Sequence, residues 1–192
     1  QSNQKLLIFV SSGRVFTLNP NELPSGKSNP KSYIYFIETE SNEKLVSIIV
    51  PEENKNCLLI SLNGKGFITD TNSLISNQKK GKKLFNLKIS DILIKVLIVN
   101  EKYIAITNKS GKLLIFDINS LPILQKGSGV QLMKLKKNES ISDIKLLDRS
   151  EGLIWHSSSK IKKLNDITFW IGKRAQSVKK VPKYFNKNFK FE

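Results

Sequence analysis

A short pattern recurs along this chain at nearly constant spacing. It consists of an apolar run, a polar turn with Gly and a basic residue, a second apolar run, and a Leu ten residues after the Gly. The three clear turns are Ser12-Gly13-Arg14, Asn63-Gly64-Lys65 and Ser110-Gly111-Lys112, and their glycines lie 51 and then 47 residues apart. A fourth copy, at Ser158-Ser159-Lys160, has Ser in place of the Gly. A period of this length is typical of repeat arrays and propellers.

Each period predicts four short strands. The apolar runs are short, rich in Ile, Val and Phe, and separated by Asn, Ser, Gly and Lys, which is the composition of strands joined by turns. The expected strands are 45–50, 57–62, 66–71 and 84–87, then 92–99, 103–107, 112–118 and 130–135, then 141–147, 153–157 and 160–164 with a poorly defined last strand.

The hairpin glycines have a backbone role, because tight hairpin turns need positive φ. A single helical turn is expected after each of the first three hairpins, within 19–24, 71–74 and 117–122. The Leu of each repeat then packs that turn onto the sheet. We therefore expect Leu23, Leu74 and Leu121 to be core residues.

A four-stranded sheet repeated about every 48 residues predicts an all-β, propeller-like domain of about four blades. The expected blades cover 1–41, 42–88, 89–137 and 138–180, and residues 181–192 form a C-terminal tail of alternating aromatic and basic or Asn residues. This tail is expected either to be disordered or to lie along the last blade. The chain opens almost directly into its first apolar run, so we expect a fragment of a longer polypeptide.

Composition limits the class of protein. A hydrophobic content of 39% is enough for a folded core, and no apolar stretch reaches the ~18 residues that a membrane-spanning helix needs. Cys57 is the only cysteine, which excludes an intrachain disulfide and favours a cytoplasmic location.

The net charge of +16 and the pI near 9.9 indicate a polyanionic partner. Arginine occurs only at Arg14, Arg149 and Arg174, so nearly all of the positive charge is Lys, and the chain is also rich in Asn and Ile. An AT-rich genome gives this composition to all of its proteins. A basic surface without a partner therefore stays open as an alternative.

A second element, basic and glycine-containing, follows each hairpin by about sixteen residues. Its copies are 25–28, 78–84, 125–130 and 172–176. A loop that places ammonium groups at the same site of every blade would form a periodic cationic track, which suits the phosphates of a duplex. The alternative is a solvated loop that binds nothing.

The residues of an enzyme site are missing. Gly26-Lys27-Ser28 resembles the end of a phosphate-binding loop, but that motif needs a Gly where Asn21 stands. His156 is the only histidine and has no Cys or carboxylate cluster in the sequence around it, so neither a metal site nor a Ser-His-Asp set is expected. We expect no catalytic residue and no cofactor in this fragment.

Where blade and basic element join, the sequence becomes specific. Residues 121–132, Leu-Pro-Ile-Leu-Gln-Lys-Gly-Ser-Gly-Val-Gln-Leu, resemble a segment of the C-terminal domain of the bacterial topoisomerase IV A-subunit. Residues 11–24 and 81–84 resemble earlier blades of the same domain, and the similarity covers most of residues 1–175. The related gyrase A domain is marked by a Gln-Arg-Arg-Gly-Gly-Lys-Gly box. Residues 78–84 keep its Gln, two bases, a Gly and a later Lys, but have Lys82 and Leu84 where the box has Gly, so gyrase A is the alternative.

The resemblance implies a β-pinwheel, a propeller-like ring of blades that exchange strands and whose outer rim binds and bends DNA. About four blades implies either a missing first blade or an open arc. The DNA-cleaving tyrosine of the family lies in a separate N-terminal region, and none of Tyr33, Tyr35, Tyr103 and Tyr184 lies in its motif. The fragment would therefore not cleave DNA, although it would belong to an ATP-dependent type IIA topoisomerase.

The predicted function is to engage a DNA segment and so support decatenation and relaxation of DNA. The expected phosphate contacts are Arg14, Lys65, Lys79, Lys80, Lys82, Lys83, Lys112, Lys126, Lys173 and Arg174. The resemblance implies as partners double-stranded DNA, the rest of the A-subunit and the ATPase B-subunit in a heterotetramer that uses ATP and Mg²⁺. No membrane is involved, the isolated domain is expected to be a monomer, and the location is the bacterial cytoplasm at the nucleoid. The competing class is a protein-interaction propeller with an acidic partner.

Overall fold

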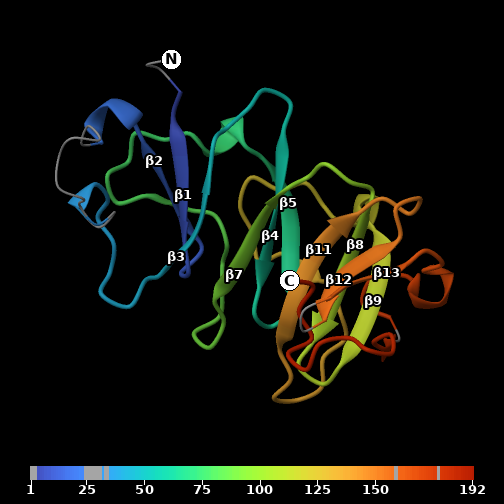
Figure 1. Ribbon diagram of the computed structural model, residues 1–192. Coiled ribbons are helices and arrows are strands. Elements are labelled where there is room, and N and C mark those ends of the chain that lie inside the picture. The colour runs from blue at the N-terminus through green and yellow to red at the C-terminus, as the bar shows by residue number, and fades with distance from the viewer. Residues whose placement is uncertain (1–3, 24–31, 33–34, 158–159, 177) are drawn as a thin grey trace. The chain divides into compact units, whose positions relative to one another are not determined.

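The computed structural model describes residues 4–23, 32, 35–157, 160–176 and 178–192, and they form an all-β fold (Figure 1). These residues contain strands and short 3-10 helices but no α-helix, and none of their helices is long and apolar enough to cross a membrane. The chain divides into two compact units. Unit 1 comprises Gln1–Leu59, Ile68–Ile98 and Ile123–Ser128, and unit 2 comprises Ile60–Phe67, Val99–Pro122 and Gly129–Glu192.

All four predicted hairpins are present. They are β1 (Leu6–Val10) with β2 (Arg14–Leu18), β4 (Asn56–Ser61) with β5 (Lys65–Asp70), β8 (Tyr103–Asn108) with β9 (Lys112–Asp117), and β12 (Leu153–Ser157) with β13 (Lys160–Leu164). β4 and β8 are buried at every position after the first, because their apolar runs are covered on both faces. The β4–β5 hairpin contributes residues to both units.

The outer strands of each four-stranded sheet come from the next period of the sequence. β3 (Leu45–Ile49) and β6 (Lys82–Lys83) flank the first hairpin in the order β3-β1-β2-β6. β7 (Leu93–Ile98) and β10 (Val130–Gln131) flank the second hairpin, and β11 (Ile141–Leu147) and β14 (Lys179–Lys180) flank the third. β12 and β13 make up the fourth sheet among the described residues.

The all-β, propeller-like class is thus confirmed, and its sheets exchange strands. The ranges 42–88, 89–137 and 138–180 mark periods of the sequence and do not coincide with sheets. In the range 42–88, for example, β3 and β6 pair with the hairpin of the preceding range. A hairpin has two open edges, and the alternation of its side chains carries no information on which later segment covers them.

The short helical turns after the first three hairpins are confirmed as 3-10 helices η1 (Pro20–Glu22), η3 (Asn72–Leu74) and η4 (Ile118–Ser120), and a further one, η5 (Thr168–Trp170), follows the fourth hairpin. Leu74 and Leu121 are buried as predicted, with 0% and 6% exposure. The prediction for Leu23 is wrong, because Leu23 is 38% exposed and η1 buries none of its residues.

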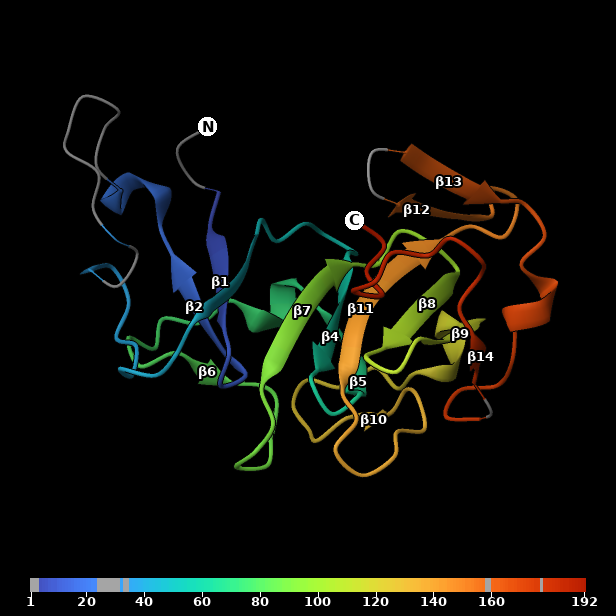
Figure 2. The ribbon, with the colours of Figure 1, turned by 60° about the horizontal axis from the view of Figure 1, so that its bottom comes forward.

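The C-terminal segment 181–192 is docked in unit 2 along β11 and β12 (Figure 2). Phe191 is 1% exposed within a core cluster that also contains Trp155 and Ile115. The Phe191 N–H donates to Asp143 Oδ2 at 2.9 Å, and the His156 N–H donates to the Phe191 carbonyl at 2.9 Å. Of the two expectations for this segment, packing along the last blade is the one observed.

Candidate nucleic-acid interface

The hairpin turns hold their glycines in the left-handed region. The φ angles of Gly13, Gly64 and Gly111 are 81°, 75° and 73°. Each glycine N–H donates to the carbonyl three residues earlier, at 3.0, 3.0 and 3.1 Å. A side chain at these positions would be strained, so the repeated glycine is explained by the turn itself.

The basic element returns to these same turns. The N–H of Leu84 donates to the Gly13 carbonyl at 3.0 Å, that of Leu132 to Gly64 at 2.8 Å, and that of Val181 to Gly111 at 3.0 Å. The two-residue strands β6, β10 and β14 immediately precede these anchors and pair with the start of β2, β5 and β9. The structure therefore brings each basic element against a hairpin in an equivalent position.

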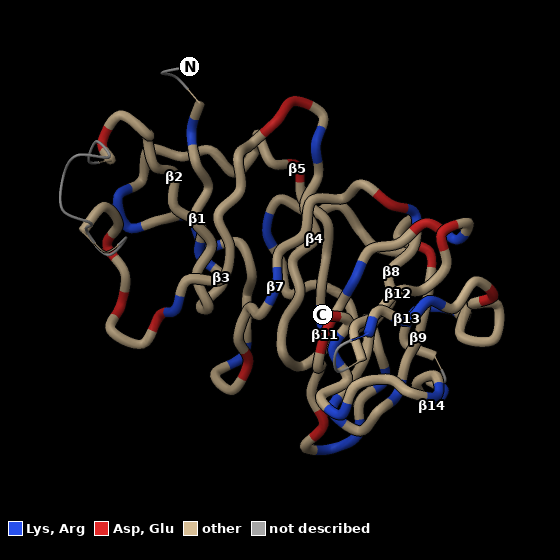
Figure 3. The backbone as a smooth tube through the Cα atoms, viewed as in Figure 1, with Lys and Arg blue, Asp and Glu red and all other residues tan. Residues whose placement is uncertain are grey.

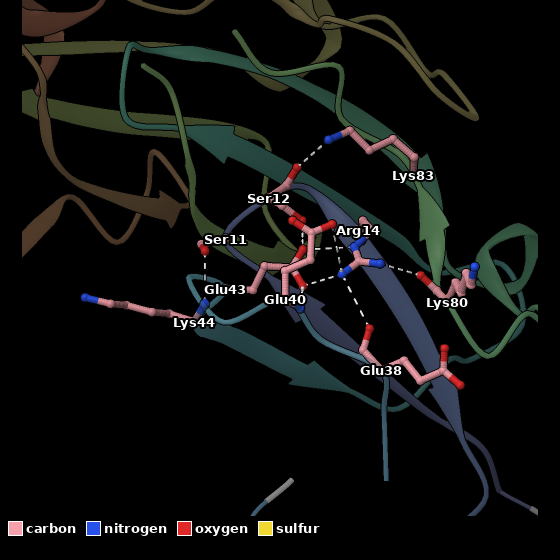
Figure 4. A network of polar contacts seen from close by, with 9 residues as sticks. All are labelled: Ser11, Ser12, Arg14, Glu38, Glu40, Glu43, Lys44, Lys80 and Lys83. Atoms are coloured by element: carbon pink, nitrogen blue, oxygen red, sulfur yellow. Dashed lines mark hydrogen bonds and ion pairs between the residues drawn. The ribbon is translucent and has the colours of Figure 1, made fainter. Parts of the chain in front are cut away.

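Arg14 lies at the centre of a polar network in unit 1 (Figure 4). Its side chain is 15% exposed and forms an ion pair with Glu43, whose side chain is 2% exposed. The guanidinium also donates to the Lys80 carbonyl at 2.7 Å and lies 3.8 Å from a carboxylate oxygen of Glu40. This residue fastens the loop before β3 and the basic element to the first hairpin.

The carboxylate of Glu43 is held in its ionised form. Burial opposes its ionisation, but hydrogen bonds from Arg14, from the Ser12 hydroxyl and from the Glu40 N–H outweigh burial and keep the pKa of Glu43 below its ordinary value. The same pairing raises the pKa of Arg14. The two groups are therefore charged together at neutral pH.

Two more of the expected phosphate contacts also bind the protein itself. The ammonium of Lys82 donates to the Ser73 carbonyl at 2.8 Å, and that of Lys83 donates to the Ser12 carbonyl at 2.9 Å. In β10 the amide of Gln131 takes the place of Lys83 and donates to the Asn63 carbonyl at 3.1 Å. A donor at this position clamps the residue before the hairpin glycine, whether or not it is charged.

Arg174 has a similar structural role in unit 2. Its Nη1 donates to the Gln131 carbonyl at 2.7 Å and its Nε to the Ser120 carbonyl at 3.2 Å. The guanidinium therefore ties the segment after η5 to β10 and to the end of η4.

The other six predicted residues keep their ammonium groups available. Lys79, Lys80, Lys126 and Lys173 are exposed, and Lys65 and Lys112 are half-buried as the first residues of β5 and β9. Within the described part of the chain no hydrogen bond or ion pair holds these six ammonium groups. The first copy of the basic element, 25–28, lies outside the described residues.

Sequence reasoning missed the true counterpart of Lys82 and Lys83 in the third sheet. By register, Lys180 pairs with Lys112 as Lys83 pairs with Arg14, so β14 takes the place of β6. The prediction used the earlier Gly172-Lys173-Arg174 instead. Spacing from the hairpin glycine to the next apolar anchor would have identified Lys179 and Lys180.

No enzyme site accompanies this surface in the described ranges. No group of three or more His, Cys, Asp or Glu that could hold a metal ion occurs among them. Burial, together with the negative charge of Asp70, raises the pKa of the Cys57 thiol to about 12, which leaves it protonated and unreactive. His156 is exposed on β12.

Positive charge is unequal between the two units (Figure 3). Unit 1 contains 13 Lys and Arg against 8 Asp and Glu, a net charge of +5. Unit 2 contains 19 against 8, a net charge of +11. Most of the excess charge of the chain therefore belongs to unit 2.

Comparison with known families accounts for the repeat. The model of the DNA gyrase C-terminal domain, a β-propeller, matches residues 4–52, 55–100 and 102–148. The chain belongs to this family. The three matched segments each contain one of the glycine hairpins described above.

Curated relatives of this gyrase C-terminal domain family member are named as the A-subunit of DNA topoisomerase 4. The chain is 35% identical over 190 residues to that of Rickettsia felis, which covers 99% of this chain and 26% of the relative. It is 28% identical to that of Caulobacter vibrioides, over 100% of this chain and 25% of the relative. The chain thus spans about a quarter of the length of the curated relatives it matches.

Solved domains of the family have the same fold. The E. coli ParC C-terminal domain superposes with a TM-score of 0.85 at 19% identity, over 97% of this chain and 80% of that domain. The DNA gyrase A C-terminal domain gives a TM-score of 0.67 at 19% identity, over 91% of this chain and 58% of that one. The expected resemblance to these C-terminal domains is therefore confirmed.

Proposed function

We propose that this chain is a non-catalytic domain of the topoisomerase IV A-subunit that binds duplex DNA through the phosphates. The observation that carries the proposal is the repeated anchoring of a basic element against a glycine hairpin, at Gly13, Gly64 and Gly111. Fixed backbone with exposed lysines on it suits a backbone ligand that itself repeats. The names of the curated relatives support this assignment.

The structure narrows the set of proposed phosphate contacts. Lys79, Lys80, Lys126 and Lys173 are exposed, and Lys65 and Lys112 lie beside the hairpin glycines. Arg14, Lys82, Lys83 and Arg174 spend hydrogen bonds on the protein itself. We assign phosphate binding first to the six residues with available ammonium groups and only second to these four.

In the holoenzyme the domain would engage a DNA segment at its basic outer rim, bend it, and support decatenation and relaxation in the bacterial cytoplasm. The rest of the A-subunit would supply the cleaving tyrosine, and the B-subunit would supply ATP hydrolysis in a heterotetramer with Mg²⁺. The alternative within the family is the DNA-wrapping domain of gyrase A, which the family model and the gyrase A fold match support. Supercoiling of a relaxed circle in the presence of a topoisomerase separates the two, because only wrapping traps supercoils.

The salt dependence of duplex binding tests the proposal. If about six phosphates are neutralised, log Kd against log salt should have a slope of about 5, since each contact contributes ~0.9. Affinity should also depend little on base sequence. A flat salt dependence, or displacement of an acidic protein in preference to DNA, would instead favour a protein-interaction propeller.

A further inference from the structure

A second basic surface lies on unit 2 away from the repeat elements and carries an exposed aromatic ring. Tyr184 is 76% exposed, whereas Phe191 in the same segment is 1% exposed. The ammonium of Lys162, on β13, lies 5.6 Å from the centre of the Tyr184 ring. We call this surface, formed by β13 and residues 183–190, the tyrosine patch.

The backbone holds the Tyr184 ring at the surface. Its φ is 65°, a conformation that bulky residues rarely adopt. The Trp155 Nε1–H donates to the Tyr184 carbonyl at 3.1 Å, and the next side chain, Phe185, stacks on Trp155 with ring centres 5.4 Å apart. Glycine would suit this turn without strain, so a ring that is neither buried nor favoured by the backbone points to a ligand.

The charge around the ring has one sign. β13 contributes Lys160, Lys162 and Lys163, and the C-terminal segment contributes Lys183, Lys187 and Lys190. All except Lys162 are exposed, and no Asp or Glu occurs within 160–164 or 178–191. The patch therefore attracts a polyanion and presents a π-face to it.

We propose that the tyrosine patch binds single-stranded DNA, with one base stacked on Tyr184 and the neighbouring phosphates on the lysines. Stacking platforms flanked by cations are the chemistry by which proteins bind unpaired strands without sequence preference. A duplex offers its phosphates but covers the faces of its bases, and an acidic peptide has carboxylates but no base. The exposed ring thus favours an unpaired strand over both, a ligand beyond the proposed duplex function.

Titration of a fluorescent oligo(dT) of about 20 nucleotides, followed by anisotropy, tests this proposal. Tyr184→Ala should weaken binding roughly 5- to 150-fold, the loss expected for one base stack, while Tyr184→Phe should bind as the unmodified chain does. Tyr35→Ala is the matched control, since Tyr35 in unit 1 is 75% exposed and no cation of the described residues lies over its ring. It should leave oligo(dT) binding unchanged.

Three results would overturn the proposal. Tyr184→Ala could bind oligo(dT) like the unmodified chain, it could lose oligo(dT) and duplex binding by the same factor, or Tyr35→Ala could have the same effect. Tyr184→Gly separates ring loss from misfolding, because Gly suits the positive φ, and it should keep the thermal midpoint while losing oligo(dT) affinity. Full affinity of this glycine variant would also contradict the proposal.

Discussion

The two units use the same repeat position in different ways. In unit 1 the basic residue after the hairpin glycine is Arg14, and its charge is matched by the buried carboxylate of Glu43. In unit 2 the equivalent residues are Lys65 and Lys112, and no carboxylate of the described residues pairs with them. Unit 2 also has a net charge of +11 against +5 in unit 1. The same period therefore contributes more to packing in unit 1 and leaves more charge for a ligand in unit 2.

Loss of the buried C-terminal anchor should give the largest effect, confined to unit 2. Phe191→Ala removes a ring that is 1% exposed and packs edge-on against Phe185 at 5.6 Å, so we expect about 3–5 kcal/mol of lost unfolding free energy in urea denaturation. Hydrogen exchange should become faster in β11 and β12 but not in β1 and β2. Lys190→Ala, at an exposed neighbouring position, should change stability by less than about 0.5 kcal/mol.

Comparison of the equivalent hairpin residues should give the next largest effect. Arg14→Ala leaves the Glu43 carboxylate buried without its partner, and we expect a loss of about 2–3 kcal/mol because the pair is only partly buried. Lys112→Ala removes the equivalent residue of unit 2 and should cost less than about 0.5 kcal/mol. Equal losses in urea denaturation would remove the structural distinction between the two units.

The Glu43 carboxylate should make unit 1 sensitive to acid. Its folded pKa is below the ordinary value of 4.5, so its contribution to stability is present above that value and is lost as the pH falls through the folded pKa. Glu43→Gln should therefore be less stable than the unmodified chain at pH 7, and this difference should shrink below about pH 4. Urea denaturation at both pH values measures it, and a difference that stays constant with pH would contradict the role of this carboxylate.

Much of the fold could be predicted because it is local. Hairpins follow from apolar runs on either side of a glycine turn, and the 3-10 helices follow from capping residues such as Asp117, whose Oδ1 accepts the Asn119 N–H at 2.8 Å. Which outer strand covers which hairpin depends on contacts between segments about 70 residues apart, such as Leu84 with Gly13. Such pairings leave no local pattern, and for this reason the strand exchange came only from the resemblance.

The candidate site was predicted in position but not in role. Lysines recur in phase partly because β6 and β14 must cover a hairpin edge, and Lys83 bonds to the Ser12 carbonyl as Gln131 does to that of Asn63. The structural demand of Arg14 was invisible in the sequence because its partner, Glu43, lies 29 residues away. Charge alone could not separate the residues that hold the fold from those free to bind phosphate.

The most direct test of the account is a comparison of two quadruple variants with the same charge change, by duplex binding at several salt concentrations. One replaces Lys79, Lys80, Lys126 and Lys173 of the repeat elements by Ala, and the other replaces the exposed Lys5, Lys44, Lys55 and Lys102 outside them. We predict that the first variant loses up to about 3.6 from the salt slope, ~0.9 for each contact, and that the second keeps the slope of the unmodified chain. Equal slopes for the two variants would contradict the account, because the positive charge would then act without regard to the repeat.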